Sequence, residues 1–146
     1  MTLLWRYESM MMTGQFPGGA PGMSKKVTVL TVLVVEDDVL MRMHGIDILE
    51  DAGFHVLEAT NADDALVILN EGTQVHMLFS DIEMPGSMDG IGLAQAVHER
   101  WPLIHVLLTS SHHRLHNVSV PGTGQFLRKP WTSQALVGQV QEMIAA

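Results

Sequence analysis

Short apolar runs alternate along the chain with longer segments in which apolar residues recur every three or four positions. The runs are rich in valine, leucine and isoleucine, which is typical of strands covered on both faces, and the longer segments have the spacing of amphipathic helices. The pattern predicts five strands, over residues 27–35, 55–59, 75–81, 104–109 and 125–128. Strands that alternate with helices form a parallel sheet through right-handed crossovers, so the expected fold is α/β, a doubly wound (βα)5 sheet.

Helical spacing begins near residues 39, 62, 91 and 133. Residues that favour helix caps and helix ends flank these segments. They are Asn61 and Thr132 or Ser133 as caps, and Gly53, Gly72 and Pro102 as ends. Residues 110–124 are weakly patterned, with room for a short helix around 112–117. The periodicity therefore predicts four clear helices and leaves the connection before the last strand undefined.

Polar residues gather where the predicted strands end. The carboxyl ends of parallel strands share one edge of the sheet, and ligands of open α/β sheets bind at that edge. The residues at or directly after these ends are Glu36, Asp37, Asp81, Thr109 and Lys129. Because they come from four different strands, the fold itself is expected to bring them together.

The residue types at this edge indicate phosphoryl transfer onto a carboxylate. The carboxylates of Asp37 and Asp81 would repel each other, and a hard divalent cation relieves that repulsion. Oxygen ligands without His or Cys favour magnesium over zinc. Lys129 supplies a positive charge and Thr109 a hydroxyl, the two kinds of donor that phosphoryl oxygens accept from. Asp81 is then the expected nucleophile, forming an aspartyl phosphate.

The chain resembles the receiver domains of two-component response regulators over about residues 29–145. The motifs that carry the resemblance follow the family order: Glu36-Asp37, Asp81 with Met84-Pro85-Gly86 and Asp89-Gly90, Thr109-Ser110 and Lys129-Pro130. The resemblance implies a flavodoxin-like sheet with strand order 2-1-3-4-5. It also implies that the domain catalyses its own phosphorylation from a histidine kinase and its slow dephosphorylation. The phosphorylated form would change its affinity for a downstream protein or a phosphotransfer protein.

The same resemblance assigns the acidic residues. Asp81 is similar to the family's phosphoacceptor. Asp37, Asp81 and the backbone carbonyl of Glu83 are similar to its Mg²⁺ site, with Glu36 acting through water.

The resemblance also implies how phosphorylation is sensed. Thr109 and Lys129 are similar to the family's phosphate-sensing pair, and Phe126 to the aromatic residue that changes rotamer together with Thr109. The Lys129-Pro130 bond is expected to be cis, although only a small minority of X-Pro bonds are.

Some features depart from the family pattern or lie outside its motifs. Ser87 is an additional residue in the loop after Asp81, and the segment in place of the fourth helix is short and polar. Its histidines are interpreted as residues of a solvated loop rather than a metal site. They are His112, His113 and His116. Trp101 and Trp131 are interpreted as half-buried packing residues.

Composition limits the partners and the setting. The net charge of −8 disfavours direct binding to nucleic acid, and no apolar run approaches the ~20 residues that cross a bilayer, so no membrane association is expected. The absence of cysteine is compatible with the cytoplasm. Residues 1–26 are interpreted as a flexible tail before a receiver domain over 27–146, with Met23 resembling a natural start. One helix's length of chain follows Pro130, so a stand-alone receiver is expected.

Two other functions use similar residues. A Mg²⁺-dependent phosphatase of the haloacid dehalogenase type also forms an aspartyl phosphate, but it carries a second Asp two residues after the nucleophile, where this chain has Glu83. It would also carry a later acidic pair, and none follows the fourth strand. The other function is a receiver-like binding module that does not use phosphate.

Overall fold

The strands of the computed structural model pair only with parallel neighbours, in the order β2-β1-β3-β4-β5. The structure describes residues 28–112 and 119–145. The strands are β1 (Thr31–Val35), β2 (His55–Ala59), β3 (Met77–Asp81), β4 (His105–Ser110) and β5 (Gln125–Arg128). The helices of the described residues are α2 (Val39–Asp51), α3 (Ala62–Asn70), α4 (Gly90–Arg100) and α5 (Ser133–Ala145). The predicted fold class and strand order are confirmed.

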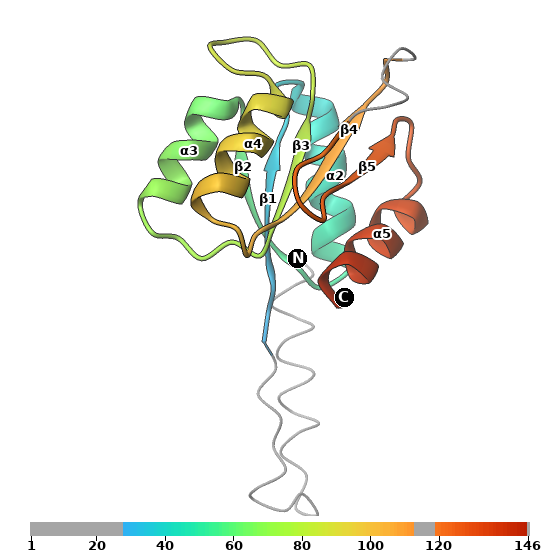
Figure 1. Cartoon of the computed structure of the whole chain (residues 1–146). Coiled ribbons are helices and arrows are strands. Elements are labelled where there is room, and N and C mark those ends of the chain that lie inside the picture. The colour runs from blue at the N-terminus through green and yellow to red at the C-terminus, as the bar shows by residue number, and fades with distance from the viewer. Residues whose placement is uncertain (1–27, 113–118, 146) are drawn as a thin grey trace, which may run out of the picture.

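Two helices cover each face of the sheet, as Figure 1 shows with α3 and α4 on one side and α2 and α5 on the other. Each pair encloses its own apolar cluster, one including Leu33 and Leu78 and the other including Val34 and Phe79. Every residue of the central strands β1 and β3 is buried. This burial on both faces explains why the two strands are nearly continuous apolar runs in the sequence.

Polar side chains cap the helices at the ends that face the carboxyl edge. Asp38 accepts hydrogen bonds from the backbone of Leu40 and Met41, and Asn61 caps α3 as predicted. Asp89 caps α4, and Thr132 accepts from the backbone N–H of Ala135 at the start of α5. Asp38 satisfies two of the free N–H groups of α2 and is its cap, so the preceding Glu36 and Asp37 are not needed in that role.

The first strand is shorter than the sequence predicts. Thr31 pairs with His55, where β2 begins, and Val32 pairs with Met77, where β3 begins. Residues 28–30 therefore precede the paired part of the strand, although the carbonyl of Leu30 still accepts from the backbone N–H of His55 at 2.9 Å. The Lys129-Pro130 peptide bond is cis, as expected from the resemblance.

Some sequence predictions fall outside the described residues. These are the tail over residues 1–26, most of the short helix around 112–117, and His113 and His116. Within the described part of the connection, Val120 packs with Phe126 against the apolar cluster under α3 and α4. Across the part of the chain that is described, none of the helices is both long and apolar enough to span a bilayer.

Candidate functional site

The strand register brings the predicted polar residues to one edge of the sheet. Val35 pairs with Ser80 and Asp81 pairs with Thr109, so the residues that follow β1 lie beside the end of β3 and the end of β4. The backbone N–H of Lys129 donates to the carbonyl of Ser110 at 3.0 Å, which places Lys129 directly after the β4–β5 pairing. Alternation along the strands then directs Asp81 and Thr109 toward the face covered by α2 and α5.

Three carboxylates meet at the centre of this edge. Glu36, Asp37 and Asp81 each offer a carboxylate oxygen, and these oxygens lie within 4.8 Å of one another. Glu36 and Asp81 are buried, whereas Asp37 is exposed. A group of hard oxygen donors that is open to solvent on one side fits Mg²⁺, which retains part of its hydration shell. The residues present therefore match the cation expected from the sequence.

The charge balance at Asp81 also favours a cation. Burial and the neighbouring carboxylate of Glu36 raise the pKa of Asp81 to about 7, although the ammonium of Lys129 lowers it in part. The carboxylate of Glu83 adds a further raising contribution. The ionised form of Asp81 is thus held under repulsion, which a bound divalent cation would relieve.

Lys129 lies between two of the carboxylates. Its Nζ donates to Oε1 of Glu36 at 2.8 Å and lies 3.5 Å from Oδ1 of Asp81. Burial lowers the pKa of Lys129, but the hydrogen bond to Glu36 and the charge of Asp81 outweigh this effect and raise it above its ordinary value. Lys129 is therefore charged, and its nearest carboxylate is Glu36 rather than Asp81.

Arg42, a buried residue that the sequence did not indicate, binds the backbone next to the acidic residues. Nη1 of Arg42 donates to the backbone carbonyl of Glu36 at 2.7 Å, and its Nε contacts Oε1 of Glu58 at 3.1 Å. The Arg42 side chain is buried, whereas that of Glu58 is 59% exposed. The bond to the Glu36 carbonyl fixes the chain just before Asp37, where the acidic pair leaves β1.

Glu83 connects the loop after β3 to the end of β4. Its side chain accepts a hydrogen bond from the hydroxyl of Ser110, which in turn accepts from the backbone N–H of His112 at 2.9 Å. The additional residue Ser87 is also anchored, since its hydroxyl donates to the carboxylate of Asp63 at 3.0 Å. Hydrogen bonds therefore hold this loop at both ends.

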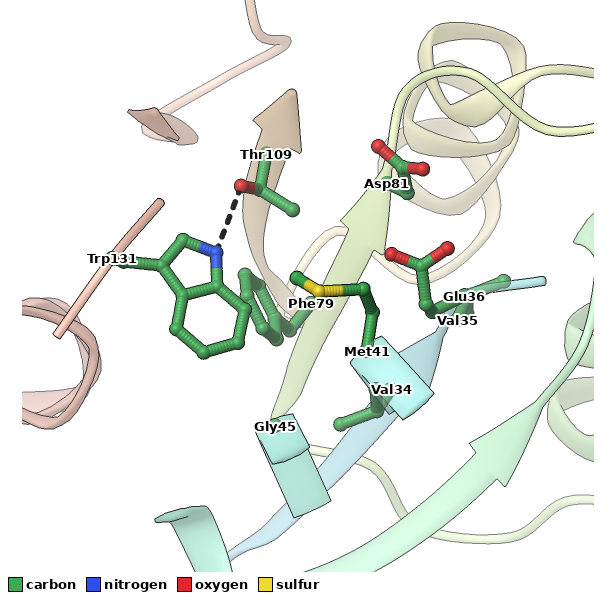
Figure 2. A pocket seen from close by; sticks show the side chains of 9 residues that line it. All are labelled: Val34, Val35, Glu36, Met41, Gly45, Phe79, Asp81, Thr109 and Trp131. Carbon is green, nitrogen blue, oxygen red and sulfur yellow. Dashed lines mark hydrogen bonds between the residues drawn. The ribbon is translucent and has the colours of Figure 1, made fainter. Parts of the chain in front are cut away.

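Thr109 contacts an aromatic residue on the side away from the carboxylates. The indole N–H of Trp131 donates to Oγ1 of Thr109 at 3.2 Å, and both side chains are buried. Figure 2 shows the hydroxyl of Thr109 pointing toward the indole rather than toward Asp81. Trp131 packs in the core, as the sequence predicts, but the expectation that it is half-buried is wrong: it is 8% exposed, and it also forms a specific hydrogen bond.

A narrow pocket lies between the carboxylates of Glu36 and Asp81 and the hydrogen-bonded pair of Thr109 and Trp131. It has room for about one water molecule, with a volume of about 10 Å³. It is lined by Val34, Val35, Glu36, Met41, Gly45, Phe79, Asp81, Thr109 and Trp131 (Figure 2). A pocket of this size excludes an organic ligand, so the chemistry of the site belongs to the open side, where Asp37 is exposed.

Phe126 lies on the other face of the sheet from Thr109. It pairs with Leu108, and both pack into the cluster under α3 and α4, whereas Thr109 pairs with Leu127 in the cluster under α2 and α5. The structure thus places the two predicted switch residues on neighbouring strands without bringing their side chains to one face.

Comparisons with known proteins agree with this geometry. Residues 32–141 match the family described as response regulator receiver domain. This chain belongs to that family. As a receiver domain it is 31% identical to the response regulator receiver protein CpdR of Brucella abortus, across 79% of this chain and 97% of that protein. It is 34% identical to part of the sensor kinase CckA of Brucella abortus, across 78% of this chain and 12% of the kinase.

Solved structures and other relatives place the receiver domain in different contexts. The crystal structure of a response regulator receiver protein from Sinorhizobium medicae matches with a TM-score of 0.75 and 26% identity, over 81% of this chain and 96% of that one. The chain spans only 12% to 24% of the length of the first curated relatives it matches. Family membership favours a response regulator receiver over both the phosphatase and the phosphate-independent module.

Sequence reasoning missed Arg42 and the role of Trp131. A weak signal for Trp131 exists in Gly45, a glycine in the middle of α2, where alanine is preferred. A Cβ at Gly45 would lie 3.6 Å from Cη2 of Trp131, an ordinary contact distance, so the glycine lies beside the indole without being required by it. The sequence gives no means of finding which residue approaches it.

Proposed function

We propose that this receiver domain accepts a phosphoryl group on the carboxylate of Asp81. An Oδ atom of Asp81 attacks the phosphorus of a phosphohistidine, the P–N bond breaks, and the leaving imidazole takes up a proton. The product is an acyl phosphate on Asp81. The observation that carries the proposal is the position of Asp81, buried at a strand end between a second carboxylate and the ammonium of Lys129.

The acidic residues are proposed to hold Mg²⁺. Asp37 and Asp81 would bind it together with the backbone carbonyl of Glu83, and Glu36 would act through water. Bound Mg²⁺ neutralises the negative charge that accumulates when a phosphoryl group approaches carboxylates. The cluster of oxygens within 4.8 Å supports this assignment.

Lys129 and Thr109 are proposed to bind the transferred group. Lys129 already lies 3.5 Å from Asp81, so its ammonium can donate to a phosphoryl oxygen after a small shift away from Glu36. Thr109 pairs with Asp81 across the two strands, so its hydroxyl can reach a phosphoryl oxygen after rotation about χ1. Thr109 would then report phosphorylation to the rest of the domain.

The proposed donor is a sensor histidine kinase, and the proposed receiver unit is residues 27–146. A relative of this domain lies within a sensor kinase, which supports a histidine kinase as the source of the phosphoryl group. The phosphorylated domain would bind a downstream protein or a phosphotransfer protein with altered affinity. We place these reactions in the cytoplasm.

Intact-mass spectrometry with acetyl phosphate tests the function without a cognate kinase. We expect one phosphoryl group per chain in the presence of Mg²⁺, none after chelation, and none in Asp81→Asn. Asp47→Asn is the matched control, because Asp47 is exposed on α2 and the same substitution there leaves the edge intact. Labelling of Asp81→Asn to the wild-type extent would place the acceptor elsewhere, and no labelling of any variant would favour the phosphate-independent module.

A further inference from the structure

We propose that Trp131 is a positioning residue that restrains the hydroxyl of Thr109 and releases it when Asp81 is phosphorylated. The inference rests on the proposed function, because it assigns a restraint to the same switch. The hydrogen bond from the indole N–H to Oγ1 of Thr109, 3.2 Å long and buried, is its starting point. Nothing in the receiver motifs of this sequence includes Trp131.

Thr109 has one hydrogen-bond partner in the structure, the indole of Trp131, and one proposed partner, a phosphoryl oxygen on Asp81. The two lie in different directions from its side chain. Figure 2 shows Oγ1 of Thr109 directed at the indole, with the carboxylate of Asp81 on the other side of the Thr109 side chain. A hydroxyl that donates to a phosphoryl oxygen on Asp81 must therefore turn toward the position that its methyl group now faces. This change of rotamer moves Oγ1 away from Trp131, because staggered χ1 positions are far apart. The two hydrogen bonds are alternatives.

The indole cannot easily follow the hydroxyl, because two aromatic neighbours hold it. The ring of His44 stacks on Trp131 with centroids 5.3 Å apart and an interplanar angle of 4°. Phe79 meets it edge-on at 5.7 Å. Gly45 lines the same pocket from α2, and a Cβ there would lie at an ordinary contact distance, 3.6 Å, from Cη2 of Trp131. Trp131 is therefore a fixed donor, and the mobile partner is Thr109.

The small pocket determines what happens when the bond breaks. A buried N–H that loses its acceptor is unfavourable unless water or a rearrangement replaces it. The space beside Trp131 and Thr109 accommodates about one water molecule. A water molecule there can accept from the freed indole N–H, so breaking the bond costs about the net contribution of one neutral hydrogen bond, and phosphorylation must compete against that cost.

Side chains alternate between the two faces of the sheet, and this makes Trp131 rather than Phe126 the direct neighbour of Thr109. Phe126 belongs to the face under α3 and α4, whereas Thr109 and Trp131 share the face under α2 and α5. Rotation of Thr109 thus acts first on Trp131 and, through the ring stack, on His44 at the exposed surface of α2. The restraint and its readout lie on the same face as the site.

Indole N–H signals from ¹⁵N-tryptophan NMR of the full chain test the proposal. Trp131→Phe and Trp101→Phe assign the signals, and acetyl phosphate with Mg²⁺ supplies the phosphoryl group while intact mass measures labelling. We expect the Trp131 N–H signal to move upfield on labelling and the Trp101 signal to stay in place. In Thr109→Val, which keeps the shape but removes the hydroxyl, the Trp131 signal should already be displaced and should no longer respond.

Trp131→Phe gives an independent readout, because it keeps an aromatic ring and removes only the donor. The extent of labelling at limiting acetyl phosphate should rise about two- to tenfold, the range expected for one neutral hydrogen bond. Trp101→Phe should leave it unchanged. A Trp131 signal that does not move in fully labelled protein would overturn the restraint while leaving the proposed function intact. Absence of labelling in wild-type protein would overturn both.

Discussion

The two sides of Asp81 are built on different physical principles. On one side, Glu36, Asp37 and Lys129 form a group of charges in which repulsion between carboxylates is offset by one ammonium. On the other side, Thr109 and Trp131 form a neutral hydrogen bond enclosed by aromatic rings and a helix glycine. The charged side suits the chemistry of a phosphoryl group, and the neutral side suits detection of its arrival.

The difference shows how one strand end can serve two tasks. Charged groups act over several ångströms and adjust to a cation, whereas a neutral hydrogen bond in a close-packed pocket depends on exact orientation. Asp81 lies where the two environments meet, so a change on either side should alter phosphorylation in a different way. The following substitutions separate the two sides, beginning with one that should disturb both.

Gly90→Ala should have the largest effect. A Cβ at Gly90 would lie 2.0 Å from the backbone carbonyl oxygen of Asp81, so the end of β3 must move. We expect a loss of about 3 kcal/mol or more in unfolding free energy, as for other severe overpacking, together with loss of phosphorylation. Urea unfolding measures the first and intact mass the second.

Gly138→Ala is the matched control for that experiment. Gly138 lies in α5, and an added Cβ meets nothing within 4 Å. Alanine should stabilise the helix by about 1 kcal/mol. Equal effects of the two substitutions would mean that the close packing of Gly90 on Asp81 does not hold the site.

Lys129→Met should have the second-largest effect, a loss of stability on the charged side of Asp81. Removing one member of a buried ion pair costs about 3 kcal/mol, because the remaining charge is left without compensation. We expect a loss of stability that Mg²⁺ partly restores, since the cation replaces the missing positive charge near Glu36 and Asp81. Thermal unfolding with and without Mg²⁺ measures it.

The double variant Lys129→Met with Glu36→Gln checks the cause. If the loss comes from an unpaired carboxylate, neutralising Glu36 should recover part of it, so the two effects should be less than additive. Additive losses would contradict the pairing.

Arg42→Met tests the support behind the acidic pair. The substitution keeps an unbranched apolar stem but removes the hydrogen bond to the Glu36 carbonyl, and we expect a loss of about 1–3 kcal/mol with weaker Mg²⁺ binding. Glu58→Gln removes only the partner whose side chain is 59% exposed, and it should cost less than about 1 kcal/mol. Equal costs for the two variants, measured by chemical unfolding, would show that the ion pair rather than the carbonyl bond matters.

Gly45→Ala should have the smallest effect. The new Cβ would lie 3.6 Å from Trp131 and 3.8 Å from Phe79, which are ordinary contact distances. Helix propensity then favours alanine by up to about 1 kcal/mol. Differential scanning calorimetry should find unchanged or raised stability. A loss of more than about 1 kcal/mol would mean that the aromatic side has less space than its distances indicate.

The charged side of Asp81 could be predicted because its residues are marked by their immediate neighbours in the sequence. The pair Glu36-Asp37 and the single Asp81 each come at the end of an apolar run, so the strand pattern alone places them at one edge. The aromatic side depends on contacts between residues far apart in the chain, such as Gly45 with Trp131, and periodicity does not identify such pairs. Period-two alternation would have separated Thr109 from Phe126, but only once the pairing of Phe126 with Leu108 was known.

The carboxyl ends of the strands were also easier to predict than the connection between β4 and β5. Apolar periodicity located five strands and four helices, whereas residues 110–124 carry few apolar residues in any period. What fixes the described part of this segment is specific: Ser110 bonds to Glu83, and Gly122 lies against His98 with no room for a Cβ. Contacts of this kind have no local signature in the sequence.

The central claim is that Asp81 carries the phosphoryl group, and chemical mapping of the acyl phosphate tests it most directly. Borohydride reduces an aspartyl phosphate to homoserine, which peptide mass spectrometry then locates at a single position. After treatment with acetyl phosphate and Mg²⁺, we predict homoserine at position 81 and unmodified Asp37 and Asp89 in the same digest. Homoserine at either of those positions, with Asp81 unchanged, would contradict the account.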